Sequence, residues 1–179
     1  MPNFFDDEDD DTDQGSDLPQ GYDTAQICKN GHLITAYVES IPEHTKNNCT
    51  ICGEPTISSC DHCGQPIQGV YHIPIIGAVG NYTVPKFCHN CGKPYVWTIR
   101  QMEAAKKIID LAEGLQQNDR EDLKIAIDDI VKDSPNAKPA AYKIRAALKK
   151  IPGEAQTMLR DLIVNIASEA IVKIIMPDR

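Results

Sequence analysis

The residues best suited to chemistry in this chain are its cysteines, which recur in one short motif. The pattern C-x-x-C-G-[EQK]-P occurs three times, at residues 49–55, 60–66 and 88–94. Two thiolates three residues apart can bind one tetrahedral Zn2+ from a tight turn, and the glycine after the second cysteine permits the positive φ that such a turn often needs. One such pair is weak evidence, but three with the same flanking residues predict zinc knuckles.

The number of knuckles leaves two metal ligands to be found. Three knuckles supply six thiolates, whereas two closed tetrahedral sites need eight ligands. Cys28 and His32 provide the missing pair, with Gly31 in the turn between them. Two structural zinc ions per chain are therefore expected, and His44 is the alternative to His32. The predicted ligands are Cys28, His32, Cys49, Cys52, Cys60, Cys63, Cys88 and Cys91.

The pairing of these ligands has two solutions. In the sequential pairing, which the short hairpin of a zinc ribbon favours, neighbouring pairs along the chain share a metal. In a cross-brace, as in ring-finger modules, the first pair shares its metal with the third and the second with the fourth. The sequential sites would be Cys28, His32, Cys49 and Cys52, followed by Cys60, Cys63, Cys88 and Cys91.

Other chemistry for these cysteines fits the sequence less well. Their number is seven, and the chain opens without the basic segment and apolar core of a secretory signal, so a disulfide framework is not expected. A cytoplasmic location is expected instead. The sequence has no nucleophile elbow, phosphate-binding glycine loop or other catalytic constellation, and no catalytic residue is predicted. An enzyme would need an open metal position, which would arise if His32 were not a ligand.

Composition divides the chain into three parts. Residues 1–23 hold nine of the 26 acidic residues and no Lys or Arg, which predicts a disordered acidic tail. Residues 24–97 form the predicted double zinc-ribbon module, with short strands at 33–38, 69–73 and 82–84. Because this module has few large apolar side chains, the metal must supply folding free energy. Residues 98–179 are predicted to be helical.

The helical part contains four predicted helices that together would form a small bundle. They span about 98–116, 118–133, 138–150 and 154–175, with Asn118 expected as the N-cap of the second. The last has apolar pairs every four residues from 158 to 175, which gives it a wide apolar face. That face is expected to pack in the bundle or to mediate oligomerisation, and the charges within it exclude a membrane span.

The partner suggested by this composition is a protein. The module has four lysines, no arginine and four carboxylates, and thiolate-bound zinc would add negative charge, so nucleic-acid binding is not favoured. The basic helix at 138–150 is the alternative surface for nucleic acid. Apolar residues around 73–80, with Tyr82, Phe87, Tyr95 and Trp97, either pack internally or form a partner-binding patch. A ring-like ligase module is a third possibility, requiring the cross-brace and an exposed patch around Ile75 and Trp97.

The segment from residue 22 to 98 resembles a known family. The run Tyr22-Asp-Thr-Ala-Gln-Ile-Cys-Lys-Asn-Gly-His32, the three knuckles and the closing Gly92-Lys-Pro-Tyr-Val-Trp-Thr98 are similar to an uncharacterised bacterial family of small zinc-ribbon proteins, a domain of unknown function. The resemblance implies a zinc fold and a bacterial cytoplasmic setting, and no substrate or partner. The combined expectation is a non-enzymatic zinc-ribbon adaptor with a helical domain that assembles with itself or another protein.

Overall fold

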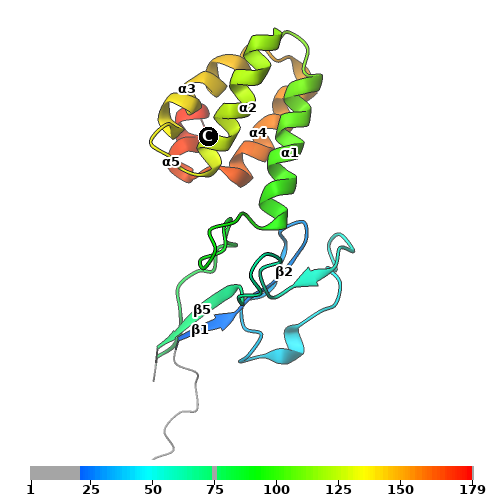
Figure 1. Cartoon of the computed structure of the whole chain (residues 1–179), viewed down its shortest axis with the longest axis vertical. Coiled ribbons are helices and arrows are strands. Elements are labelled where there is room, and N and C mark those ends of the chain that lie inside the picture. Colours follow the sequence, from blue (N-terminus) through cyan, green and yellow to red (C-terminus); the bar gives the residue numbers. More distant parts are fainter. Residues whose placement is uncertain (1–20, 74–75, 179) are drawn as a thin grey trace, which may run out of the picture.

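A computed structural model of the chain describes residues 21–73 and 76–178. The predicted acidic tail therefore lies outside the described residues up to residue 20. Two parts can be seen in Figure 1: a small β-rich module that carries the cysteines, and a helical bundle whose first helix rises directly from it. The predicted order of a β module followed by helices is confirmed.

The module contains two three-stranded antiparallel sheets. One has the order β1-β5-β6 and is formed by β1 (Gly21–Thr24), β5 (Gln68–Ile73) and β6 (Gly77–Val79). The other has the order β3-β2-β4 and is formed by β2 (Gln26–Cys28), β3 (Leu33–Thr35) and β4 (Thr56–Ile57). Only Ala25 separates β1 from β2, so the chain passes straight from one sheet to the other.

Three strand assignments differ from the sequence prediction. The strand predicted at 33–38 is shorter, since β3 ends at Thr35. β1 begins at Gly21, within the segment assigned to the acidic tail, because Tyr22 and its neighbours pair with β5. The strand predicted at 82–84 is irregular, and β5 pairs instead with β6. A positive φ of 83° at Gly77 allows that earlier return of the chain.

Five α-helices form the bundle in the described part of the chain. They are α1 (Val96–Leu111), α2 (Gln117–Val131), α3 (Ala137–Leu148), α4 (Gly153–Ile166) and α5 (Glu169–Ile175). α1 packs against α2 and α4, while α3 packs against α2 and α5. The core consists of aliphatic side chains, and its largest fully buried members are Ile109, Ile127, Ile130, Ile144, Leu148, Ile151, Leu159, Ile163 and Ile166.

The single helix predicted at 154–175 is wrong, because the chain forms two helices there. Ala167 and Ser168 adopt extended backbone angles, and Ser168 is the N-cap residue of α5. The break redirects the chain so that α5 packs on α3, while α4 packs on α1. The N-cap of α2 also differs, since it is Gln116 and Asn118 lies in the first turn.

The module and the bundle share a packed junction. Trp97 in the first turn of α1 is buried and donates its indole N–H to the carbonyl oxygen of Pro85 at 2.9 Å. Its side chain lies against Gly31, where a Cβ atom would approach the Trp97 Cβ to 3.1 Å. Phe87 packs against the core of the bundle. Arg100 of α1 donates to Glu54 at 2.9 Å and to Asn30 at 2.7 Å, so α1 is tied to two cysteine turns.

Candidate metal centres

The three knuckles have one local structure. In each, the N–H of the first cysteine donates to the carbonyl oxygen five residues on, and the glycine N–H donates back to the first cysteine's carbonyl oxygen. The glycine has φ between 68° and 74° in all three, and a β-bridge closes each turn at the proline. The repeated sequence thus encodes a repeated turn, whose cysteine-to-carbonyl bonds join Cys49 to Glu54, Cys60 to Gln65 and Cys88 to Lys93, each at 2.9 Å.

The segment from Cys28 to His32 reproduces this turn in a shorter form. Gly31 has φ 91°, and its N–H donates to the Cys28 carbonyl oxygen at 2.8 Å. The Cys28 N–H donates to the carbonyl oxygen of His32 at 3.0 Å. Since the loop is one residue shorter, His32 itself occupies the closing position, and its ring extends toward the cysteine.

The first cluster contains three thiols and one imidazole. Nδ1 of His32 lies 3.4 Å from the Cys28 sulfur and 3.6 Å from the Cys49 sulfur. The Cys28 and Cys52 sulfurs are 3.8 Å apart. Cys28 and Cys49 are buried while Cys52 is exposed, so the cluster lies at the edge of the module. All four ligand atoms lie within 4.8 Å of one another.

The second cluster contains four thiols from two knuckles. The sulfurs of Cys60 and Cys91 are 3.8 Å apart, and those of Cys63 and Cys88 are 3.7 Å apart. Cys60 and Cys88 are buried, and Cys63 is exposed. The four sulfurs again lie within 4.8 Å of one another. Both clusters contain the residues of the sequential pairing.

These separations match the edges of a tetrahedral metal site. Four sulfurs about 2.3 Å from a central ion lie about 3.8 Å from one another, and a sulfur and a nitrogen at about 2.3 and 2.05 Å lie about 3.6 Å apart. A disulfide would require about 2.05 Å between sulfurs. Both donor sets therefore have the spacing to hold a metal ion.

The electrostatics of the clusters also favour a bound cation. The backbone N–H of Cys91, together with that of Asn90, lowers the pKa of Cys88 to about 6. For Cys91, the amide of Lys93 favours the thiolate, but burial and the neighbouring thiols outweigh it and raise the pKa to about 11. Mutual repulsion thus limits how many of these sulfurs ionise together, and a cation at their centre would remove that limit.

Three of the remaining histidines lie on the surface away from the clusters. His62 and His89 are exposed between the cysteines of their knuckles, and neither belongs to a cluster. His44, the sequence alternative to His32, is exposed at the end of the 3-10 helix Pro42–His44 and belongs to neither cluster.

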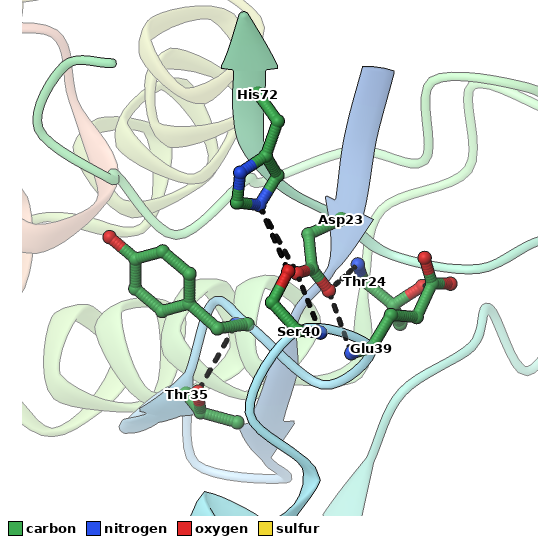
Figure 2. A network of polar contacts seen from close by, with 7 residues as sticks. Asp23, Thr24, Thr35, Glu39, Ser40 and His72 are labelled. Atoms are coloured by element: carbon green, nitrogen blue, oxygen red, sulfur yellow. Dashed lines mark hydrogen bonds and ion pairs between the residues drawn. The ribbon is translucent and has the colours of Figure 1, made fainter. Parts of the chain in front are cut away.

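His72 is a buried polar residue of the module, on a strand that the sequence predicts at 69–73. It is 4% exposed and lies on β5 facing β1, where its Nε2 is 3.3 Å from Asp23 Oδ2 and 3.2 Å from Ser40 Oγ (Figure 2). Val70 and His72 are buried while Tyr71 between them is exposed, as the two-residue period of a strand requires. The Asp23 partner of His72 could not be identified because β1 had been assigned to the tail.

The Asp23 carboxylate fixes the loop that follows β3. It accepts the backbone N–H groups of Thr24 at 2.6 Å, Glu39 at 2.9 Å and Ser40 at 3.2 Å. Burial raises the carboxyl pKa, but the hydrogen bonds from Ser40, Glu39 and Thr24 outweigh it, and the pKa falls below its usual 3.8. Asp23 is therefore an ionised structural residue at neutral pH.

The grouping of Ser40, His72 and Asp23 does not form a catalytic triad. A triad needs the acid on one imidazole nitrogen and the hydroxyl on the other, so that a proton can pass through the ring. Here both oxygens contact the same nitrogen, Nε2. The other nitrogen, Nδ1, is buried and has no hydrogen-bond partner within the described residues. The geometry supports a structural link between β1, β5 and the loop.

The apolar patch proposed from the sequence divides into buried and exposed parts. Tyr95 and Trp97 are each 3% exposed and stack with ring centroids 4.6 Å apart, so these two pack internally. Ile76 is 71% exposed, whereas Pro74 and Ile75 lie outside the described residues. The exposed patch around Ile75 and Trp97 that a ring-like module requires is therefore contradicted at Trp97.

The fold and the clusters define a class of small proteins in which a cysteine-rich module with two candidate metal centres is joined to a helical bundle. A family model described as "Uncharacterized protein conserved in bacteria (DUF2321)" matches residues 21–175, and the chain belongs to that family. The match extends through the helical bundle, beyond the segment in which the resemblance was seen. No curated protein and no solved structure matches the chain. None of the described helices has the length and apolar character that crossing a bilayer requires.

Proposed function

We propose that this protein is a non-enzymatic adaptor in which two structural zinc ions hold the N-terminal module as a pair of zinc ribbons beside a helical assembly domain. The observation that carries the proposal is the spacing of the two four-donor clusters. Thiolate and imidazole donors at these separations suit Zn2+, which prefers four-coordinate sites of sulfur and nitrogen.

A closed donor set argues for a structural role of the metal. A catalytic zinc keeps one position for water or substrate and is bound by three protein ligands. Each cluster here offers four donor atoms, so neither leaves such a position. The ligase alternative would need interlocked sites, whereas the clusters group the ligands sequentially.

The bundle supplies the assembly function in this proposal. Its exposed large apolar side chains are candidate contacts with a second copy or another protein, because burying them in an interface would be favourable. They are Leu111 at 83%, Ile125 at 62%, Tyr142 at 60% and Met158 at 55% exposure. Nucleic acid is the less favoured partner, because the cysteine module at residues 24–97 has no arginine and as many carboxylates as lysines.

The first test is the zinc content of the purified protein, measured by elemental analysis together with a count of reactive thiols. We expect two zinc ions per chain and no reactive thiol in the native state. One zinc with three reactive thiols would instead indicate that the first cluster is open, and would return Cys28, Cys49 and Cys52 to consideration as redox or catalytic groups.

Matched cysteine variants extend this test to each centre. Cys60→Ser should remove the zinc of the second cluster and unfold the surrounding residues, while the first cluster keeps its metal. Cys49→Ser should do the reverse. Retention of two zinc ions by either variant would overturn the ligand assignment. Sedimentation over a range of concentrations, with Ile125→Glu as the comparison, tests self-assembly through the exposed apolar side chains.

A further inference from the structure

A cavity of about 490 Å3 lies in the bundle between α3, α4 and the chain after α5, far in sequence from the cysteine clusters. Its volume falls within the range of small-molecule sites, about 300–1,000 Å3. Its apolar wall is formed by Leu148, Ile175 and Met176, none of which is more than 9% exposed. The cavity thus has an apolar floor that continues into the bundle core.

Three cationic side chains line the same cavity. Arg145 belongs to α3, Lys149 is the C-cap residue directly after it, and Arg160 belongs to α4, where the Thr157 hydroxyl also lines the cavity. Guanidinium and ammonium groups recognise phosphate and carboxylate oxygens through charge-assisted hydrogen bonds. Two acidic residues, Asp161 and Asp178, also line the cavity, so the cationic groups exceed the acidic ones by one.

In the described part of the chain, the three cations that line the cavity form no ion pair with a carboxylate, although two acidic residues line the same space. Within residues 21–73 and 76–178, no ion pair or side-chain hydrogen bond is formed by Arg145, Lys149 or Arg160. By contrast, three lysines of the bundle are each paired: Lys106 with Asp128 at 2.6 Å, Lys124 with Asp110 at 2.6 Å and Lys150 with Asp119 at 3.0 Å.

We infer that this cavity is a binding site for a small organic anion, a molecule with a phosphate or carboxylate group and an apolar body. The anionic group would be held by Arg145, Lys149 and Arg160, and the body would lie on Leu148, Ile175 and Met176. This inference does not depend on the metal centres or on the proposed adaptor role, because no residue of the cavity belongs to the cysteine module.

Three probes with the same aromatic body can test the inference by calorimetry on the full chain. Phenyl phosphate and benzoate carry the two candidate anions, and benzyl alcohol carries none. We expect at least one anion to bind with a Kd below about 1 mM and benzyl alcohol to bind at least about tenfold more weakly. The stronger of the two anions identifies the chemistry of the natural ligand. Equal binding of benzyl alcohol, or no binding of either anion, would overturn the inference.

Lys143 of α3 and Lys149, its C-cap residue, give a matched pair of variants. Lys149 lines the cavity and Lys143 does not, and both are exposed, so neither substitution should disturb the fold. Lys149→Ala should weaken anion binding about tenfold, as should Arg160→Ala, because each loses a charge-assisted hydrogen bond. Lys143→Ala should change the Kd less than about twofold.

An equal loss of affinity in Lys143→Ala and Lys149→Ala would show general charge attraction in place of a defined site, and would overturn the inference. The same conclusion would follow if a single-stranded oligonucleotide bound more tightly than either anionic probe, and if Lys143→Ala and Lys149→Ala lowered the affinity for the oligonucleotide equally. That result would assign the surface to nucleic-acid binding.

Discussion

The module and the bundle are stabilised by different means although they are part of one short chain. In the described residues, the bundle core comprises 23 buried apolar residues, whereas the main core cluster of the module has seven, two of which are the cysteines Cys60 and Cys88. Burial of apolar surface can stabilise the bundle by itself. The module has too little of it, so its fold depends on groups with defined geometry: the cysteine clusters, the Asp23 carboxylate and the positive-φ glycines.

Metal removal should have the largest effect and should distinguish the two parts most clearly. Structural zinc contributes about 10–16 kcal/mol of apparent binding free energy in small domains, far more than the module's core can replace. Treatment with excess chelator should therefore unfold the module and leave the bundle folded. Far-ultraviolet circular dichroism should retain most of its helical signal, while the fluorescence of Trp97, buried at the junction, should shift to the red. Cooperative loss of the helical signal would show that the two parts are not separable.

A substitution that creates a cavity in the bundle core should destabilise the bundle and leave the module unaffected. Ile163 is fully buried on α4, and Ile163→Ala should destabilise the bundle by about 2–5 kcal/mol because the vacated volume is only partly refilled. Denaturant unfolding followed by helical circular dichroism measures this loss. The zinc content should remain two per chain. A drop in zinc content would mean that the module requires an intact bundle.

Asp23→Asn tests whether polar contacts stabilise the module alongside the metal. The neutral amide is a weaker acceptor for the N–H groups of Thr24, Glu39 and Ser40, so the loop after β3 should be destabilised by about 1–3 kcal/mol. Hydrogen exchange should be faster at these three amides and unchanged in the bundle. Unchanged exchange at the Glu39 and Ser40 amides would show that the carboxylate is dispensable.

Arg100→Ala addresses the link between the two parts and should have the smallest effect. The ion pair with Glu54 is exposed, with 43% and 34% of the two side chains accessible, so its loss should cost less than about 1 kcal/mol. The unfolding midpoints of the module and of the bundle should hardly move. Lys107→Ala on the same helix is the matched control. If Arg100→Ala lowered the free energy of unfolding by more than about 1 kcal/mol, the junction would contribute more to stability than exposed contacts usually do.

The elements that could be predicted from the sequence are those with local causes. Each knuckle is a turn closed by its own hydrogen bonds, so its motif was sufficient to locate Cys60 and Cys63 together. The first three helices could be located because their apolar periodicity is regular and is interrupted by turn residues, although α1 ends at Leu111 and not near residue 116. The sequence did not decide whether Tyr95 and Trp97 are buried or exposed, because their burial depends on how α1 packs against the module.

The elements that could not be predicted depend on contacts between distant residues. The break at Ala167 and Ser168 was missed because the apolar pairs continue across it, and only the packing of α5 on α3 explains the change of direction. The pair of Asp23 and His72 joins residues 49 positions apart. Because the segment before Asp23 is acidic, β1 was not predicted, and the structural role of the buried Asp23 carboxylate could not be inferred.

The sequential grouping of the cysteine clusters has a consequence for synthesis of the chain. The ligands of the first cluster are complete at Cys52, and those of the second only at Cys91, 39 residues later. Chains lengthen by about 5–20 residues per second, so the first cluster can be complete about 2–8 seconds before the second. Interlocked sites would have to wait for the later cysteines. The nascent chain can thus complete its two candidate metal centres in a fixed order, and Trp97 covers Gly31 only after the cysteines of both clusters have been made.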